Sequence, residues 1–152
     1  MAFRDWILSS LKAVANGVAT LDGSGLVPFS QVPVSSGEDL AVTTFNTTNI
    51  SASSNCSYQW IRFNNYVMVT GQVTITENSN NANTILGVAL PIASNFTLST
   101  DIHGVVNKYD NSASEGIVDA DTVNNRALLT FYCGNASAAH LYHFHFSYKI
   151  KP

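Results

Sequence analysis

Apolar and polar residues alternate with a period of two through most of the chain after Cys56. The alternation is most regular from His140 to Lys151, where five apolar residues share one parity: Tyr142, Phe144, Phe146, Tyr148 and Ile150. Because successive side chains of a strand point to opposite faces, this spacing predicts β-strands with one buried face. An aromatic face of this kind has to be covered by a second sheet or by a neighbouring subunit.

The same period predicts a β-hairpin near the start of this region. Its strands are residues 57–63 and 66–76, and they are joined by Asn64-Asn65, a pair that tolerates the left-handed conformation. Gly71, inside the second strand, marks a bulge or a close contact. Further strands are predicted over residues 84–90, 102–108, 115–121, 126–133 and 140–151. About seven strands at regular spacing predict an all-β fold, an antiparallel β-sandwich of jelly-roll type.

The N-terminal residues have a different pattern. Phe3 to Val14 carry apolar residues at helical spacing, which predicts a short amphipathic helix that stops at Asn16-Gly17. Since so short a helix is marginal alone, we favour a docking peg that inserts into a partner or bundles with sister chains. The alternative is a surface helix packed on its own domain.

Residues 16–33 hold two short apolar alternations around a Gly-rich turn and end at a proline. The segment is too short to enclose a core, so we expect it to be stable only when added to copies of itself or to a larger particle. The residues expected to make this attachment are Trp6, Leu11, Val18, Leu21, Val27, Pro28, Phe29, Val32 and Pro33. The chain is accordingly divided into a helix with an attachment or trimerisation segment (1–40), a polar linker (41–55) and a β-sandwich domain (56–152).

Few side chains are charged. Charged residues make up 11% of the chain and the net charge is −3, which argues against nucleic acid as a partner. No apolar run is long enough to span a bilayer and no secretory signal is recognisable, so we expect synthesis in a cytosol without membrane insertion. Cys56 and Cys133 stand outside any zinc-ligand spacing. In a reducing compartment we expect two buried thiols, although the sequence leaves open whether they pair.

The sequence does not indicate catalysis. No GxSxG motif accompanies the many serines, and we expect neither an enzyme nor catalytic residues. The acidic residues offer two less favoured alternatives, a paired-carboxylate glycosidase and a calcium site without EF-hand spacing. The simpler interpretation is a set of solvated loop and edge carboxylates. The residues concerned are Asp119 and Asp121 on one strand face, with Asp101, Asp110 and Glu115 near them in sequence.

Two parts of the chain resemble bacteriophage proteins. Residues 16–33 are similar to a segment that recurs in tail-fibre and tail-associated proteins, which reads asparagine, glycine, valine, alanine, then leucine-aspartate, a turn and a proline. The body resembles a small β-domain at the C-terminal end of many phage fibre and tail proteins. The pieces that carry this second likeness are Tyr58–Trp60 with Val67–Gly71, Leu86–Phe96, Ala120–Thr122 leading into Asn125–Ala127, and Phe144–Ile150.

The resemblance implies a homotrimeric virion protein made in a bacterial cytoplasm. Its N-terminal segment would bind other virion proteins, and its domain would contact the host, with a surface glycan as a candidate partner. Both a short fibre on the tail and one fixed to the capsid fit the chain, and its short length favours the capsid, since long tail fibres usually need a shaft between anchor and tip. The alternatives are a free carbohydrate-binding lectin and, less favoured, a glycan-cleaving enzyme. Exposed aromatics such as Tyr109 or Tyr132 would stack on sugars, or else pack in a core or at a subunit seam.

His143 and His145 stand where the resembled family usually has hydroxyl residues. Period two places both imidazoles on one face. In the threefold assembly that the resemblance implies, three copies would bring six imidazoles around one axis, enough for an octahedral transition metal, similar to phage fibres with repeated His-x-His units that bind iron. The simpler alternative is a solvent-facing strand with histidines as polar spacers, and no other cofactor is expected.

Overall fold

The computed structural model describes residues 23–25, 34–109, 115–134, 136 and 138–152. The chain divides after Val34 into two units, and the second, Ser35–Pro152, carries nearly all of the described structure. The predicted helix over Phe3 to Val14 and all nine attachment residues lie outside the described residues, as does Asp110. Within the described part, no helix has the length and apolar content that a membrane crossing requires.

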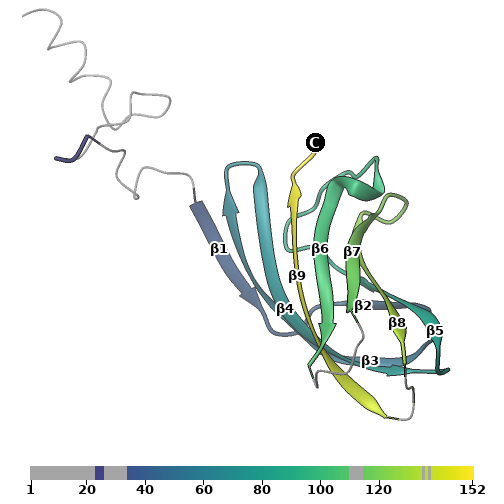
Figure 1. Cartoon of the computed structure of the whole chain (residues 1–152). Helices are drawn as coiled ribbons and strands as arrows, with labels where there is room; N and C mark the ends of the chain where they lie inside the picture. The colour runs from purple at the N-terminus through teal and green to yellow at the C-terminus, as the bar shows by residue number, and fades with distance from the viewer. Residues whose placement is uncertain (1–22, 26–33, 110–114, 135, 137) are drawn as a thin grey trace, which may run out of the picture. The chain divides into compact units, whose positions relative to one another are not determined.

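The described residues form one nine-stranded antiparallel sheet that curls, in the order β1-β3-β4-β9-β6-β7-β8-β5-β2 (Figure 1). The elements are β1 (Val34–Asp39), β2 (Thr44–Thr48), β3 (Ile50–Phe63), β4 (Tyr66–Glu77), β5 (Ala82–Val88), the 3-10 helix η2 (Ser99–Asp101), β6 (Ile102–Lys108), β7 (Glu115–Asp121), β8 (Arg126–Cys133) and β9 (Ala139–Lys149). The all-β prediction is confirmed. A sandwich of two separate sheets is not confirmed, because all nine strands belong to one ladder.

The β3–β4 hairpin forms as predicted. Phe63 pairs with Tyr66 across the Asn64-Asn65 turn, and Asn64 takes a φ of 53°. The register shifts at two places in β3, between Ile50 and Ala52 and between Ser54 and Ser57. Asn55 lies within the second of these irregularities with a φ of 51°, a conformation that asparagine tolerates better than most residues.

Residues 41–55, interpreted from the sequence as a polar linker, contribute β2 and the first part of β3. The stretch is rich in Ser, Thr and Asn, but two of its apolar residues, Val42 and Ile50, belong to the buried core. Thr is β-branched and suits an extended chain, so a polar edge strand needs little apolar sequence. The two compact units divide after Val34.

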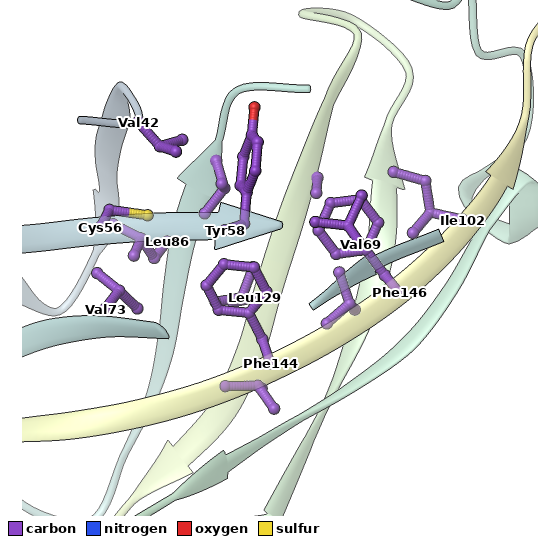
Figure 2. Close-up of a cluster of buried hydrophobic side chains, with 14 of the residues drawn as sticks. Val42, Cys56, Tyr58, Val69, Val73, Leu86, Ile102, Leu129, Phe144 and Phe146 are labelled. Carbon is purple, nitrogen blue, oxygen red and sulfur yellow. The ribbon is translucent and has the colours of Figure 1, made fainter. Parts of the chain in front are cut away.

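The core lies inside the curl, on one face of the sheet (Figure 2). Phe144 and Phe146 of β9 pack there with Tyr58 of β3 and Leu129 of β8. The predicted aromatic face of the last strand is thus covered by other strands of the same sheet. One carboxylate shares this interior: Tyr142 Oη donates a hydrogen bond to Glu77 Oε1 over 2.5 Å.

Three glycines allow neighbouring strands to approach closely within the curl. Gly71, Gly104 and Gly116 each pair with a phenylalanine on an adjacent strand: Phe144, Phe146 and Phe131 respectively. A Cβ at any of the three would lie within about 2.6 Å of that phenylalanine. The predicted close contact at Gly71 is confirmed, and the same arrangement recurs on two more strands. Glycine at such positions lets a sheet bend.

The edge strand β2, at one end of the ladder, contacts β3 through side chains. Ser53 Oγ of β3 donates to Asn46 Oδ1 of β2 over 2.7 Å, and Thr44 Oγ1 lies 2.8 Å from the same Ser53 Oγ. Just before β2, the Val42 amide donates to the Cys56 carbonyl over 2.9 Å. These contacts join the edge strand β2 to β3, which lies near the opposite edge of the ladder.

Candidate functional site

The outer face of the sheet, opposite the core, carries most of the polar residues that the sequence singles out. On β9 the buried residues alternate with exposed ones, so His143 and His145 share the outer face as predicted. His145 pairs with Thr70 of β4 and Val105 of β6, while His143 pairs with Gln72 and Asn107. The two histidines therefore lie away from both edges of the sheet, with three strands on one side of β9 and five on the other.

His143 and His145 do not by themselves form a metal site. His143 contacts the ring of Tyr109, with a centroid distance of 5.0 Å. Among the described residues, no three His, Cys, Asp or Glu side chains are grouped so that they would hold a metal ion. A single pair of imidazoles leaves an octahedral ion short of ligands. The metal at a trimer axis therefore stays a prediction that requires three chains.

A groove on this face is lined by side chains from four strands. Its volume is about 340 Å³, and its lining comes from Glu38 of β1, Ser57, Tyr58 and Gln59 of β3, Thr70, Gly71 and Gln72 of β4, and His143 of β9. The ladder explains the grouping: Ser57, Gln72 and His143 form one row across three strands, and Gln59 pairs with Thr70 in the next row. The volume lies at the small end of the range typical of ligand pockets.

The groove continues into an apolar hollow. This second depression, of about 270 Å³, is lined by Gln59, Trp60, Ile61, Met68 and Thr70, so Gln59 and Thr70 belong to both. Ile61 and Met68 pair across the β3–β4 hairpin and are 45% and 62% exposed. Large apolar side chains are thus presented to solvent directly beside amide and hydroxyl groups.

Sequence analysis did not single out Gln59, Gln72 or Met68. The signal was nevertheless present: once Asn64-Asn65 is recognised as a two-residue turn, the register of the hairpin follows, and Ser57 must face Gln72 and Gln59 must face Thr70. The contribution of β9 and of Glu38 was not accessible in this way, because it depends on which strands pair outside the hairpin.

The acidic residues considered for catalysis are held apart from this groove. Asp121 ends β7, and its carboxylate accepts hydrogen bonds from the amides of Val123 and Asn124 at 3.0 Å, from Asn124 Nδ2 at 2.9 Å and from Arg126 Nε at 2.8 Å. Burial alone would raise its pKa, but these bonds lower it to about 2. A carboxyl with so low a pKa is ionised at neutral pH, whereas a general acid must hold a proton there.

Asp101 is bound in the same manner at η2. Lys151 Nζ lies 2.7 Å from Asp101 Oδ2, which also accepts the amides of Thr97 and Leu98. The hydrogen bond from Lys151, followed by those from the two amides, lowers the pKa of Asp101 to about 2. Asp119 lies on the same face of β7 as Asp121, as expected from their spacing, while Glu115 begins that strand.

Cys56 and Cys133 are both buried thiols and do not form a disulfide. Burial, together with the charge of Asp39, raises the pKa of Cys56 to about 12. Since the thiolate is the reactive form, a thiol with so high a pKa stays protonated at neutral pH. The prediction of two buried thiols is confirmed.

Tyr132 and Tyr109 are both exposed, at 57% and 67%. Tyr132 Oη donates to the carbonyl of Asn81 over 2.6 Å, so its hydroxyl helps to hold the loop between β4 and β5. Tyr109 instead contacts His143, which lines the groove. Of the two aromatics considered for sugar stacking, only Tyr109 adjoins a groove residue through a ring contact.

Comparisons with protein-family models, with curated proteins and with solved structures find no match to this chain.

Proposed function

We propose that the chain is a structural virion protein of a bacteriophage, a short trimeric fibre on tail or capsid that presents its sheet for attachment to the host surface. The observation that carries this proposal is the contrast between two sets of polar groups. Asp101 and Asp121 are bound into turns, whereas the groove residues Gln59, Thr70 and Gln72 make no side-chain hydrogen bond to another described residue. Side chains that converge on a groove without internal partners suit binding better than catalysis.

In this proposal the N-terminal residues and the sheet have different roles. Residues 1–33 attach the protein to the particle and to sister chains, and the curled sheet serves as the sandwich-like body that points outward. Three copies on one stalk, and many stalks on one particle, multiply weak contacts into high avidity. A shallow, open groove with modest affinity is adequate for such a protein.

Deletion of residues 1–33 tests the attachment role. We expect the variant to keep the circular dichroism spectrum of a β protein and the unfolding midpoint of the full chain, because the sheet begins at Val34. We expect it to be missing from purified phage particles, measured by immunoblot against the full-length protein. Incorporation of the folded variant at the normal level would overturn the assignment.

The groove also favours the second candidate, a free lectin. The two differ in the particle: a lectin would be absent from purified virions even with residues 1–33 in place. For the less favoured glycan-cleaving enzyme, new reducing ends would appear when host polysaccharide is incubated with the protein.

A further inference from the structure

The groove and the apolar hollow that it joins form a single surface with two chemical characters. The polar part offers amide groups at Gln59 and Gln72 and hydroxyls at Ser57 and Thr70. Each amide presents one acceptor and two donor hydrogens, and each hydroxyl both donates and accepts. Sugar hydroxyls have the same dual character, so this lining can complement several of them at once.

The apolar part restricts which sugars would fit. Gln59 and Thr70 line both depressions, so a ligand group bound to them lies next to Ile61 and Met68. A plain hexose has no methyl group to place there. An acetamido substituent has an N–H and a carbonyl that can hydrogen-bond to the Gln59 amide and the Thr70 hydroxyl. Its methyl group would move out of water and pack against the apolar side chains.

Two further residues restrict the ligand. Tyr109, 67% exposed, is in ring contact with His143 of the groove lining and so offers an aromatic ring next to that residue. Glu38 contributes an exposed carboxylate to the lining, and the whole chain carries a net charge of −3. A carboxylate beside the ligand repels acidic sugars and accepts hydrogen bonds from neutral ones.

From these features we infer that the groove between β1, β3, β4 and β9 binds a neutral N-acetylated sugar, with the acetamido group between Gln59, Thr70 and Met68 and the ring over Gln72 and His143. A mono- or disaccharide fits the volume of about 340 Å³. The inference rests on the proposed attachment function and assigns it a ligand class and a location.

Titration of the full chain with N,N′-diacetylchitobiose, followed by amide chemical shifts in NMR, tests the inference. We expect saturable shifts at residues 57–61 and 68–72, with cellobiose and sialic acid at least about tenfold weaker. Equal affinity for cellobiose, or tighter binding of sialic acid, would contradict the acetamido and charge arguments. The absence of saturable shifts in the groove would overturn the site itself.

Two substitutions separate the parts of the site. Gln72→Ala is expected to weaken diacetylchitobiose binding by about tenfold, the loss of one to two hydrogen bonds. Met68→Gln is expected to bring the affinities for diacetylchitobiose and cellobiose closer together, because it replaces the apolar side chain against the acetamido methyl and leaves Trp60 and Ile61 in the hollow. Asn83→Ala on β5 is the matched control, since it removes an exposed outer-face amide that does not line the groove. If Asn83→Ala weakened binding as much as Gln72→Ala, the location would be wrong.

These outcomes are independent of the test of attachment. A protein that enters particles through residues 1–33 yet ignores every sugar would refute the inferred ligand and leave the virion role standing. A protein that binds diacetylchitobiose but never enters particles would support the ligand and favour the lectin.

Discussion

Asp121 shows how much of this fold depends on single polar side chains in turns. Its carboxylate closes the turn between β7 and β8 by accepting two amides and two side-chain donors. Arg126, one of those donors, also lies over the ring of Phe45 at 4.7 Å and so connects the turn to β2. In the same region, Asn125 takes a φ of 52° and its side chain accepts the amide of Phe96. A few Asx side chains thereby fix the turn between β7 and β8 and attach it to the segment that carries the core residue Phe96.

The low pKa values of Asp121 and Asp101 predict acid sensitivity. In the folded protein both pKa values are lowered from 3.8 to about 2, so the folded state binds fewer protons than the unfolded state between these values. The stability from these carboxylates is complete above about pH 4 and is lost as the pH falls towards about 2. Urea unfolding at a series of pH values should show this decline.

Asp121→Asn identifies the contribution of one carboxylate. At neutral pH we expect a loss of about 1–2 kcal/mol in the free energy of unfolding, since the variant loses its charge-assisted bonds. Its decline between pH 4 and 2 should be smaller than that of the parent, with Asp101 still contributing. Asp119→Asn, two residues earlier on the same strand, should reproduce the parent curve. A parent-like decline in Asp121→Asn would show that the turn does not sense its charge.

At the scale of the element, glycine and aromatic residues act in pairs. Gly71, Gly104 and Gly116 lie on strands β4, β6 and β7, each against a phenylalanine of the next strand. At Gly71 the ring of Phe144 takes the space that a side chain would occupy, whereas at Gly104 and Gly116 the backbone and Cβ of the neighbouring strand lie there, so the curl brings the core phenylalanines close to the backbone beside them.

Gly104→Ala tests this arrangement. The added methyl would collide with the carbonyl of His145 and approach Phe146 Cβ to 2.5 Å, and backbone atoms cannot rotate away. We expect a loss of about 1–3 kcal/mol in the free energy of unfolding, as for other overpacked sites. Gly134→Ala is the control, because nothing lies within 4 Å of a Cβ there, and it should change stability little. Equal unfolding midpoints for the two variants would mean that the sheet relaxes around the methyl group.

At the scale of the whole molecule, the described unit depends on how its sheet ends. A long open sheet exposes two edges, and exposed edges invite pairing with other chains. Here the edge strand β2 contacts β3 through side-chain hydrogen bonds of Ser53 with Asn46 and Thr44. Part of the β2 edge is therefore covered by side chains instead of a backbone ladder. The other edge strand, β1, lies beside β3, with Gly37 against the Trp60 ring.

Ser53→Ala should weaken the contact between β2 and β3. The variant loses both side-chain contacts between β2 and β3, and we expect a cost of about 1–2 kcal/mol in the free energy of unfolding. Hydrogen exchange should accelerate at the β2 amides before those of β4 or β9. Ser54→Ala, whose side chain is exposed on the same strand, is the matched control and should exchange like the parent. Uniform acceleration in all strands would argue that β2 is not a separate point of opening.

For strands with one buried face, the local sequence was enough to predict where the strand lies and which side chains are exposed. Residues 102–108, 115–121 and 126–133 were predicted with the observed bounds, and the hairpin turn and the exposed parity of His143 and His145 were also correct. These features need only the alternation of side chains and the turn preference of asparagine, both of which are local.

Residues 41–55 show what the alternation cannot reveal. A strand of Thr, Asn and Ser has no apolar parity, and its place in the sheet is set by partners far away in sequence, at Val88 and Glu77. The same limit applied to the number of sheets: alternation identifies a buried face without saying which residues cover it. The sequence alone therefore determined that this protein is built of amphipathic strands. Only the tertiary structure decided that these strands form one curled sheet and that four of its strands line one groove, with Glu38, Gln59, Gln72 and His143 among the lining residues. The physical reason is that strand order and long-range register depend on contacts that the local pattern does not encode.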